Sequence, residues 1–121
     1  MTRTETTRLL VDTVQGITVA SFSDPMIVSQ EAFSELDEQL QSLIDEIPNP
    51  NPKLLLNFRE VRIMSSTMLA ILIKLSRKLA RVDGRLKLCG ISPDLMVIFK
   101  ISRFDRIFEI HSEEWAALDA F

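Results

Sequence analysis

The sequence predicts an α/β fold, a mixed and mainly parallel sheet of about five strands with helical crossovers and an N-terminal β-hairpin at its edge. Short apolar segments alternate with segments of helical periodicity after residue 29, and this alternation is typical of parallel strands joined by helices. Before residue 23, two strand-like segments are separated only by Gln15-Gly16, a turn that suits a hairpin. The 121 residues are enough for one domain with one core.

The chain begins with a polar segment, residues 1–7 (MTRTETT), which we expect to be a flexible N-terminus. Residues 8–121 are expected to form a single domain. Its hairpin consists of residues 9–14 and the β-branched segment 17–22.

The first helix is expected from about residue 30 to residue 46. Ser29 can cap it, and Glu31 lies near its positive N-terminus. Its apolar positions recur at helical spacing: Phe33, Leu36, Leu40, Leu43, Ile44 and Ile47. A proline-rich loop then leads to residues 54–58 (LLLNF), a continuous apolar run typical of a central strand covered on both faces.

The second helix is expected to open at Ser65-Ser66-Thr67 and to end at Asp83-Gly84. Its apolar stripe consists of Leu69, Leu72, Leu75, Leu79 and Val82, and its other face carries Lys74, Arg77, Lys78 and Arg81. The spacing places the four cations on one side of the helix. They form either a solvated face or part of a docking surface for an acidic partner.

The last third contains a strand at residues 85–89 and a helix that begins at Ser92-Pro93-Asp94, where a cap precedes a proline at the first helical position. An edge strand is expected at residues 107–110, and a last helix starts after Ser112. Trp115 is expected to anchor that helix in the core rather than to stack on a ligand.

The composition excludes several classes of function. The net charge of −3 at pH 7 argues against nucleic-acid binding. The phosphate-binding motifs GxxxxGK[ST] and GxGxxG and the zinc motif HExxH are missing, and the chain has one histidine and one cysteine, so we expect no catalytic residue, no metal site and no cofactor. Cys89 and His111 are the single residues of their types. We expect a buried, unreactive thiol for Cys89 and a surface or capping role for His111.

The first twenty residues are charged and lack an apolar segment, which is unlike a secretory signal. The longest nearly apolar run, residues 63–73, is too short for a bilayer, which takes about 20 residues. We therefore expect a cytoplasmic protein without direct membrane insertion.

Ser65, Ser66 and Thr67 place three hydroxyl groups at a strand-to-helix junction. One hydroxyl can cap the helix, a contribution of about 1 kcal/mol, so two remain unexplained. A phosphate there would meet unpaired N–H groups at the positive helix end and would add a charge of about −1.5 to −2 to a docking surface. From the residues alone, capping is the simpler interpretation and phosphorylation is the alternative.

Residues 54–110 resemble a STAS domain of the anti-sigma factor antagonist type. The resemblance rests on the hydrophobic strand, the loop and helix start at residues 61–69 (VRIMSSTML), the amphipathic helix, and the later Ser92-Pro93-Asp94 and residues 104–108 (FDRIF). It covers roughly residues 8–120.

This resemblance implies a regulatory protein and not an enzyme. Such a protein binds an anti-sigma factor that is also a serine kinase, is switched off when that partner phosphorylates it, and is restored by a serine phosphatase. The resemblance places the phosphorylated residue at Ser66, with Ser65 as second choice. The partner-binding residues that it implies are Asp24, Ser65, Ser66, Thr67, Met68 and Lys74.

Two positions depart from the family pattern: Ser65 stands where the family has Asp, and Met68 where it has Gly. We expect Met68 to enlarge the contact surface. Two alternatives stay open. The domain could be a STAS-type adaptor of a transport or signalling assembly without phospho-regulation, or the helix end at Ser66 could hold a nucleotide phosphate.

Overall fold

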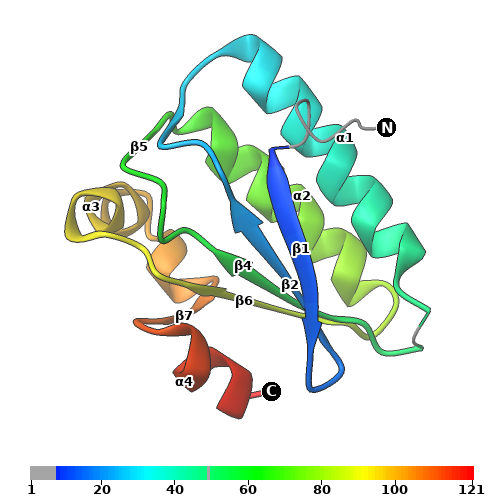
Figure 1. Ribbon diagram of the computed structural model, residues 1–121. Coiled ribbons are helices and arrows are strands. Elements are labelled where there is room, and N and C mark those ends of the chain that lie inside the picture. Colours follow the sequence, from blue (N-terminus) through cyan, green and yellow to red (C-terminus); the bar gives the residue numbers. More distant parts are fainter. Residues whose placement is uncertain (1–7, 49) are drawn as a thin grey trace.

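The computed structural model describes residues 8–48 and 50–121 (Figure 1). The segment expected to be a flexible N-terminus, residues 1–7, lies outside the described residues. The main sheet has five strands in the order β1-β2-β4-β6-β7. They are β1 (Leu9–Val14), β2 (Ile17–Phe22), β4 (Lys53–Asn57), β6 (Arg85–Cys89) and β7 (Glu109–His111). β1 is antiparallel to β2 and the other neighbours are parallel, which confirms the predicted α/β fold with its hairpin at the edge.

Four α-helices accompany the sheet: α1 (Gln30–Glu46), α2 (Thr67–Ala80), α3 (Pro93–Ile101) and α4 (Glu114–Asp119), with a short 3-10 helix, η2 (Phe104–Arg106), after α3. Ser29 caps α1 by accepting a hydrogen bond from the Ala32 N–H at 3.1 Å, as predicted. α2 ends where Asp83 adopts a left-handed backbone (φ 56°) and the Gly84 N–H donates to the Leu79 carbonyl at 2.7 Å.

The two faces of the sheet are covered unequally. Buried residues of α1, α2 and α3 pack on one face, where the rings of Phe22, Phe58 and Phe99 follow one another at 4.6 and 6.4 Å between centroids. On the other face, a smaller cluster packs against Ala117 of α4; it consists of Ile17, Val19, Leu55 and Cys89. Figure 1 shows α1 and α2 side by side along the sheet, with α4 apart from them.

A second sheet of two very short strands joins β3 (Met26–Ile27) to β5 (Ile63–Met64) in parallel. The sequence predicted neither strand, and residues 63–64 were expected to lie in the loop before the second helix. Two residues are too few to show the alternation that marks a strand. This small sheet connects the loop after β2 to the start of α2, and so it shapes the predicted site.

Two apolar residues lie outside the core in which the sequence placed them. Trp115 is 68% exposed, so the prediction of a core anchor is wrong. It stands two residues before the buried Ala117, roughly 200° around the helix, and the two side chains cannot face the same way. Val82 is 47% exposed because α2 ends at Ala80 and its apolar stripe ends with it.

Candidate functional site

The serine loop, residues 63–67, links β5 to α2. The Ser65 carbonyl accepts a hydrogen bond from the Met68 N–H at 3.0 Å, and the Ser66 carbonyl accepts one from Leu69 at 2.9 Å. The Ser65 hydroxyl accepts one from the Thr67 N–H at 3.3 Å and lies 3.4 Å from the Thr67 hydroxyl. Ser65 thus supplies the side-chain cap of α2.

Ser66 differs from its neighbour. Its backbone is already helical (φ −61°, ψ −17°), and its side chain is exposed. Within the described part of the chain, its hydroxyl makes no hydrogen bond. The sequence has three hydroxyl groups where one is enough to cap the helix. The geometry assigns Ser65 to capping and leaves the Ser66 hydroxyl without a hydrogen bond to the described residues, at the positive end of a 14-residue helix.

The Asp24 loop, residues 24–28, lies against the serine loop. The Pro25 carbonyl accepts hydrogen bonds from the N–H groups of Arg62 (2.7 Å) and Ile63 (3.0 Å), and the Ile27 carbonyl accepts one from Ser65 (3.0 Å). Backbone hydrogen bonds therefore bring Asp24 and the serines, which lie about forty residues apart in sequence, to one end of the molecule.

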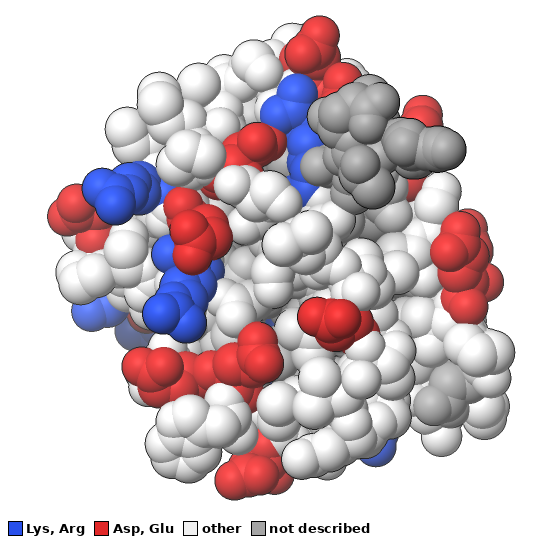
Figure 2. All heavy atoms as spheres, in the orientation of Figure 1, with Lys and Arg blue, Asp and Glu red and all other residues white. Residues whose placement is uncertain are grey.

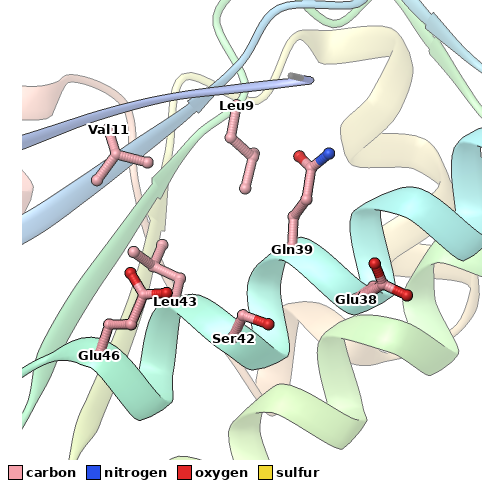
Figure 3. A pocket seen from close by; sticks show the side chains of 7 residues that line it. All are labelled: Leu9, Val11, Glu38, Gln39, Ser42, Leu43 and Glu46. Carbon is pink, nitrogen blue, oxygen red and sulfur yellow. The ribbon is translucent and has the colours of Figure 1, made fainter. Parts of the chain in front are cut away.

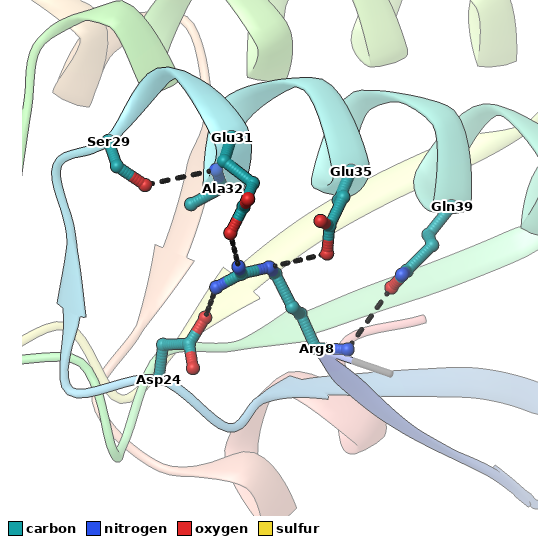
Figure 4. Close-up of polar contacts among 7 residues, drawn as sticks. All are labelled: Arg8, Asp24, Ser29, Glu31, Ala32, Glu35 and Gln39. Atoms are coloured by element: carbon teal, nitrogen blue, oxygen red, sulfur yellow. Dashed lines mark hydrogen bonds and ion pairs between the residues drawn. The ribbon is translucent and has the colours of Figure 1, made fainter. Parts of the chain in front are cut away.

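The Asp24 carboxylate is held by Arg8 and is not free. The Arg8 guanidinium lies 2.6 Å from Asp24, 2.9 Å from Glu35 and 3.4 Å from Glu31. Figure 4 shows these three carboxylates around one arginine, which joins β1, the Asp24 loop and α1. Hydrogen bonds to Glu35 and then Asp24 raise the pKa of Arg8. Sequence reasoning missed Arg8 because no local pattern links it to positions so far along the chain.

Thr67 is exposed beside Ser66, but Met68 is not. Met68 is fully buried in the main core, with an exposed fraction of 0%. The expectation that Met68 enlarges the contact surface is therefore wrong. In the first turn of α2 the Met68 side chain points to the core while those of Ser66 and Thr67 point to solvent.

Lys74 lies apart from the serines, about 12 Å further along the axis of α2. It forms an ion pair with Asp37 of α1 at 2.9 Å. It lines a groove between α1 and α2 together with Arg77, Lys78 and Arg81. The structure thus assigns Lys74 to a different surface from the serine loop.

Exposed apolar side chains border the serine loop. Met26 of β3 and Ile63 of β5 are register partners and are 54% and 52% exposed. Val28, at the end of the Asp24 loop, is exposed as well. We call the residues of the two loops that reach solvent the serine surface; they are Asp24, Met26, Val28, Ile63, Ser65, Ser66 and Thr67. Exposed apolar groups gathered beside polar ones are typical of a protein-binding surface.

The remaining candidate side chains lie elsewhere. Cys89 is buried as predicted, and desolvation, together with Glu114 and Glu113, raises the pKa of its thiol to about 12. His111 lies in β7, where its Nε2 is 2.8 Å from Glu109. Glu109 also pairs with the almost fully buried Lys87 at 2.5 Å, and hydrogen bonds from Lys87 and His111 lower the pKa of Glu109. Among the described residues, no cluster of His, Cys, Asp or Glu could hold a metal ion.

A pocket of about 290 Å³ lies between β1 and α1 (Figure 3). Leu9 and Val11 reach it from β1, while Gln39, Ser42 and Leu43 reach it from α1. None of its lining residues belongs to the serine surface, so it is not part of the predicted site. On the face shown in Figure 2, acidic and basic side chains are intermixed.

The comparisons with known proteins agree with this architecture. The family model described as "STAS domain" matches residues 8–117. The chain belongs to the STAS domain family. A sequence relative is "Putative anti-sigma factor antagonist BtrV" of Bordetella bronchiseptica, which is 25% identical over 94% of each chain. This STAS domain is therefore similar to an anti-sigma factor antagonist along almost its whole length.

Solved structures share the fold. An anti-sigma factor antagonist STAS protein of Planctomyces limnophilus superposes with a TM-score of 0.81 at 18% identity, covering 93% of this chain and 96% of that one. The phosphorylated form of SpoIIAA from Bacillus superposes at 0.66 with 18% identity, covering 93% and 99%. A sulfate transporter family protein of Wolinella succinogenes superposes at 0.72 with 18% identity, covering 90% and 87%. At these identities the likeness shows the fold alone. Among the described residues of this chain, no helix has the length and apolar character to cross a membrane.

Proposed function

We propose that this STAS domain is an anti-sigma factor antagonist that binds an anti-sigma factor/serine kinase and is switched off by phosphorylation of Ser66. The observation that carries the proposal is the exposed, uncommitted Ser66 hydroxyl at the N-terminus of α2. The partner would cover the serine surface, with a serine phosphatase restoring the binding form, and the exchange would take place in the cytoplasm. No catalytic step belongs to this protein.

The choice of Ser66 over Ser65 rests on access and on helix capping. Ser65 is a partly buried residue whose hydroxyl accepts the Thr67 N–H, so a phosphate there would displace the cap of α2. Ser66 can accept a phosphate without loss of any hydrogen bond to the described residues. The nearby helix end favours the added negative charge. Phosphorylation can therefore change the surface without unfolding the domain.

A phosphate at Ser66 would act on binding through charge and desolvation. It adds a charge of about −1.5 to −2 next to the apolar side chains of Met26 and Ile63. A partner that covers these side chains in the unmodified protein would have to desolvate the phosphate as well. SpoIIAA, which shares this fold, exists in a phosphorylated form, and this supports the same kind of switch here.

The test is affinity capture from a lysate of the native organism with three baits: the wild type, Ser66→Glu and Ser66→Ala. We expect the wild type and Ser66→Ala to recover a serine kinase of the ATPase type, and Ser66→Glu to recover at least roughly tenfold less. Ser65→Ala is the matched control, since it removes the neighbouring hydroxyl without adding charge. Equal recovery of the kinase by wild type and Ser66→Glu would refute the switch.

The second candidate is a phosphorylation-independent adaptor in a transport or signalling assembly. This second candidate is supported by the fold that the chain shares with the Wolinella sulfate transporter family protein. The same experiment separates the two candidates. Recovery of one transporter or scaffold protein by all three baits would support the adaptor and exclude the antagonist.

A further inference from the structure

A groove of about 630 Å³ lies between α1 and α2 and extends along α2 from Ala70, in its first turn, to Arg81. Its floor is apolar, with Ala70 and Ile73, and Gln41 contributes from α1. Its rim carries the four cations Lys74, Arg77, Lys78 and Arg81. We call these seven residues the basic groove. The sequence predicted that the four cations share one side of the helix, and the groove confirms it.

The four cations have two different roles. Lys74 and Lys78 form ion pairs with α1. Lys74 lies 2.9 Å from Asp37, and Lys78 lies 2.9 Å from Asp45. Arg77 and Arg81 are exposed, and neither has an ion-pair partner among the described residues. They lie four residues apart, one above the other on the helix. The groove therefore contains two adjacent guanidinium groups that form no ion pair with the described residues.

The basic groove continues into an apolar hollow at the C-terminal end of α2. This second hollow has a volume of about 240 Å³ and shares Lys78 with the groove. Its other lining residues are Ile44, Asp45, Ile47, Pro52 and Val82. Val82, 47% exposed, is the residue expected in the core that the structure places here instead. The combined surface is a line of positive charge that ends in an apolar patch.

Helix electrostatics account for part of this arrangement only. Cations in the last turn are favoured by the helix dipole, which explains Arg77 and Lys78. It does not explain why α2 contains no acidic residue in a chain with 17 Asp and Glu against 14 Lys and Arg. If the exposed face of α2 served solubility alone, it could carry both acidic and basic residues. Opposite charges three or four residues apart would then stabilise the helix.

We propose that the basic groove is a docking site for an acidic segment of a partner protein. Two carboxylates of the segment would pair with Arg77 and Arg81, and one apolar side chain would cover Val82. The planar guanidinium group of arginine is suited to bidentate pairing with a carboxylate. The site is separate from the serine surface, and its occupation does not depend on phosphorylation of Ser66.

Nucleic acid fits the groove less well. Asp37 and Asp45 of α1 pair with two cations of the groove, so a continuous chain of phosphates there would also meet carboxylates. Non-specific binding of such a polyanion needs an extended basic footprint, and this protein has a net charge of −3. A short protein segment can place its few carboxylates on the arginine side alone.

The test uses the full chain and a defined probe, a fluorescein-labelled peptide of about 14 residues, which as a helix matches the length of α2. The peptide has Glu and Leu at helical spacing, and a second version has Gln in place of Glu. Fluorescence anisotropy gives the affinity, and two-dimensional NMR of the labelled protein locates the contact. The variant Arg77→Glu/Arg81→Glu is compared with Lys100→Glu/Arg106→Glu, which reverses two exposed cations outside the groove. Circular dichroism confirms that both variants are folded.

We expect the Glu peptide to perturb α1 and α2 residues around the groove. Its affinity should fall at least roughly tenfold in Arg77→Glu/Arg81→Glu and less than about twofold in the control, and it should weaken as salt is raised. Ser66→Glu should bind it like the wild type. The proposal is overturned by equal affinity of the groove variant, by equal binding of the Gln peptide, by perturbations elsewhere, or by tighter binding of an oligodeoxythymidylate than of the Glu peptide.

Discussion

The two ends of α2 present surfaces that are built in different ways. At the N-terminal end, backbone hydrogen bonds from the Asp24 loop fix the serine loop, and apolar side chains surround a single free hydroxyl. At the C-terminal end, side-chain ion pairs join α2 to α1, and two arginines face solvent. The first surface combines a loop held by backbone hydrogen bonds with exposed apolar side chains, while the second is lined by cations and joined to α1 by ion pairs.

This difference determines what can regulate each surface. In the proposed function, binding at the serine surface would depend on burial of apolar groups, so one added phosphate should change it strongly. The binding proposed for the basic groove would depend on charge, so salt should change it and a distant phosphate should not. Arg77 and Arg81, the proposed pairing residues, lie about 16 and 22 Å from Ser66 along α2, which is about two screening lengths or more at physiological salt. The two surfaces can therefore act independently.

The largest effect on the free energy of unfolding is expected from the apolar residues that distinguish the two ends of α2. Met68→Ala removes a fully buried side chain beneath the serine loop and should lower the free energy of unfolding by about 2–5 kcal/mol. Val82→Ala, at the other end and 47% exposed, should change it by less than about 1 kcal/mol. Urea denaturation followed by circular dichroism measures both. Similar losses for the two variants would mean that the ends are packed alike.

A smaller effect is expected when the cap of the serine end is removed. Ser65→Ala deletes the hydroxyl that accepts the Thr67 N–H and should lower the free energy of unfolding by about 1 kcal/mol. Ser65→Asp, which restores an acceptor, should recover most of the loss. Urea denaturation under the same conditions measures both variants. If Ser65→Ala has no effect, Ser65 is not the cap and the assignment of roles to the two serines fails.

The general architecture of both ends could be predicted from the sequence, but their detail could not. Helical spacing placed the four cations together, and the hydroxyl residues that can cap a helix located the start of α2. The pairing of β3 with β5 and the hold of Arg8 on Asp24 depend on contacts between distant segments, which leave no local pattern. Met68 was wrongly expected at the surface, because it stands where the family pattern has Gly. Its helical position, about 200° around α2 from Ser66 and about 100° from Thr67, turns the Met68 side chain to the core.

The ion pairs of the basic groove should contribute less than the cap. Lys78 is 28% exposed and Asp45 is 68% exposed, and such pairs contribute roughly 0.2–1 kcal/mol. A double-mutant cycle with Lys78→Met and Asp45→Asn isolates this coupling, since methionine keeps the apolar part of the side chain in place. The coupling should shrink in high salt. A salt-independent coupling above about 2 kcal/mol would contradict the weak, screened ion pair expected at this end.

The smallest effect on stability is expected at the residue with the largest proposed effect on binding. Ser66→Ala removes a hydroxyl that is exposed and makes no hydrogen bond within the described residues, so the free energy of unfolding should change by less than about 0.5 kcal/mol. Urea denaturation beside Ser65→Ala provides the matched comparison, because the two variants remove the same group from adjacent positions. A loss of about 1 kcal/mol for Ser66→Ala would mean that its hydroxyl stabilises α2. Phosphorylation at Ser66 would then disturb the helix as well as the surface, and the switch would act through folding rather than through the interface.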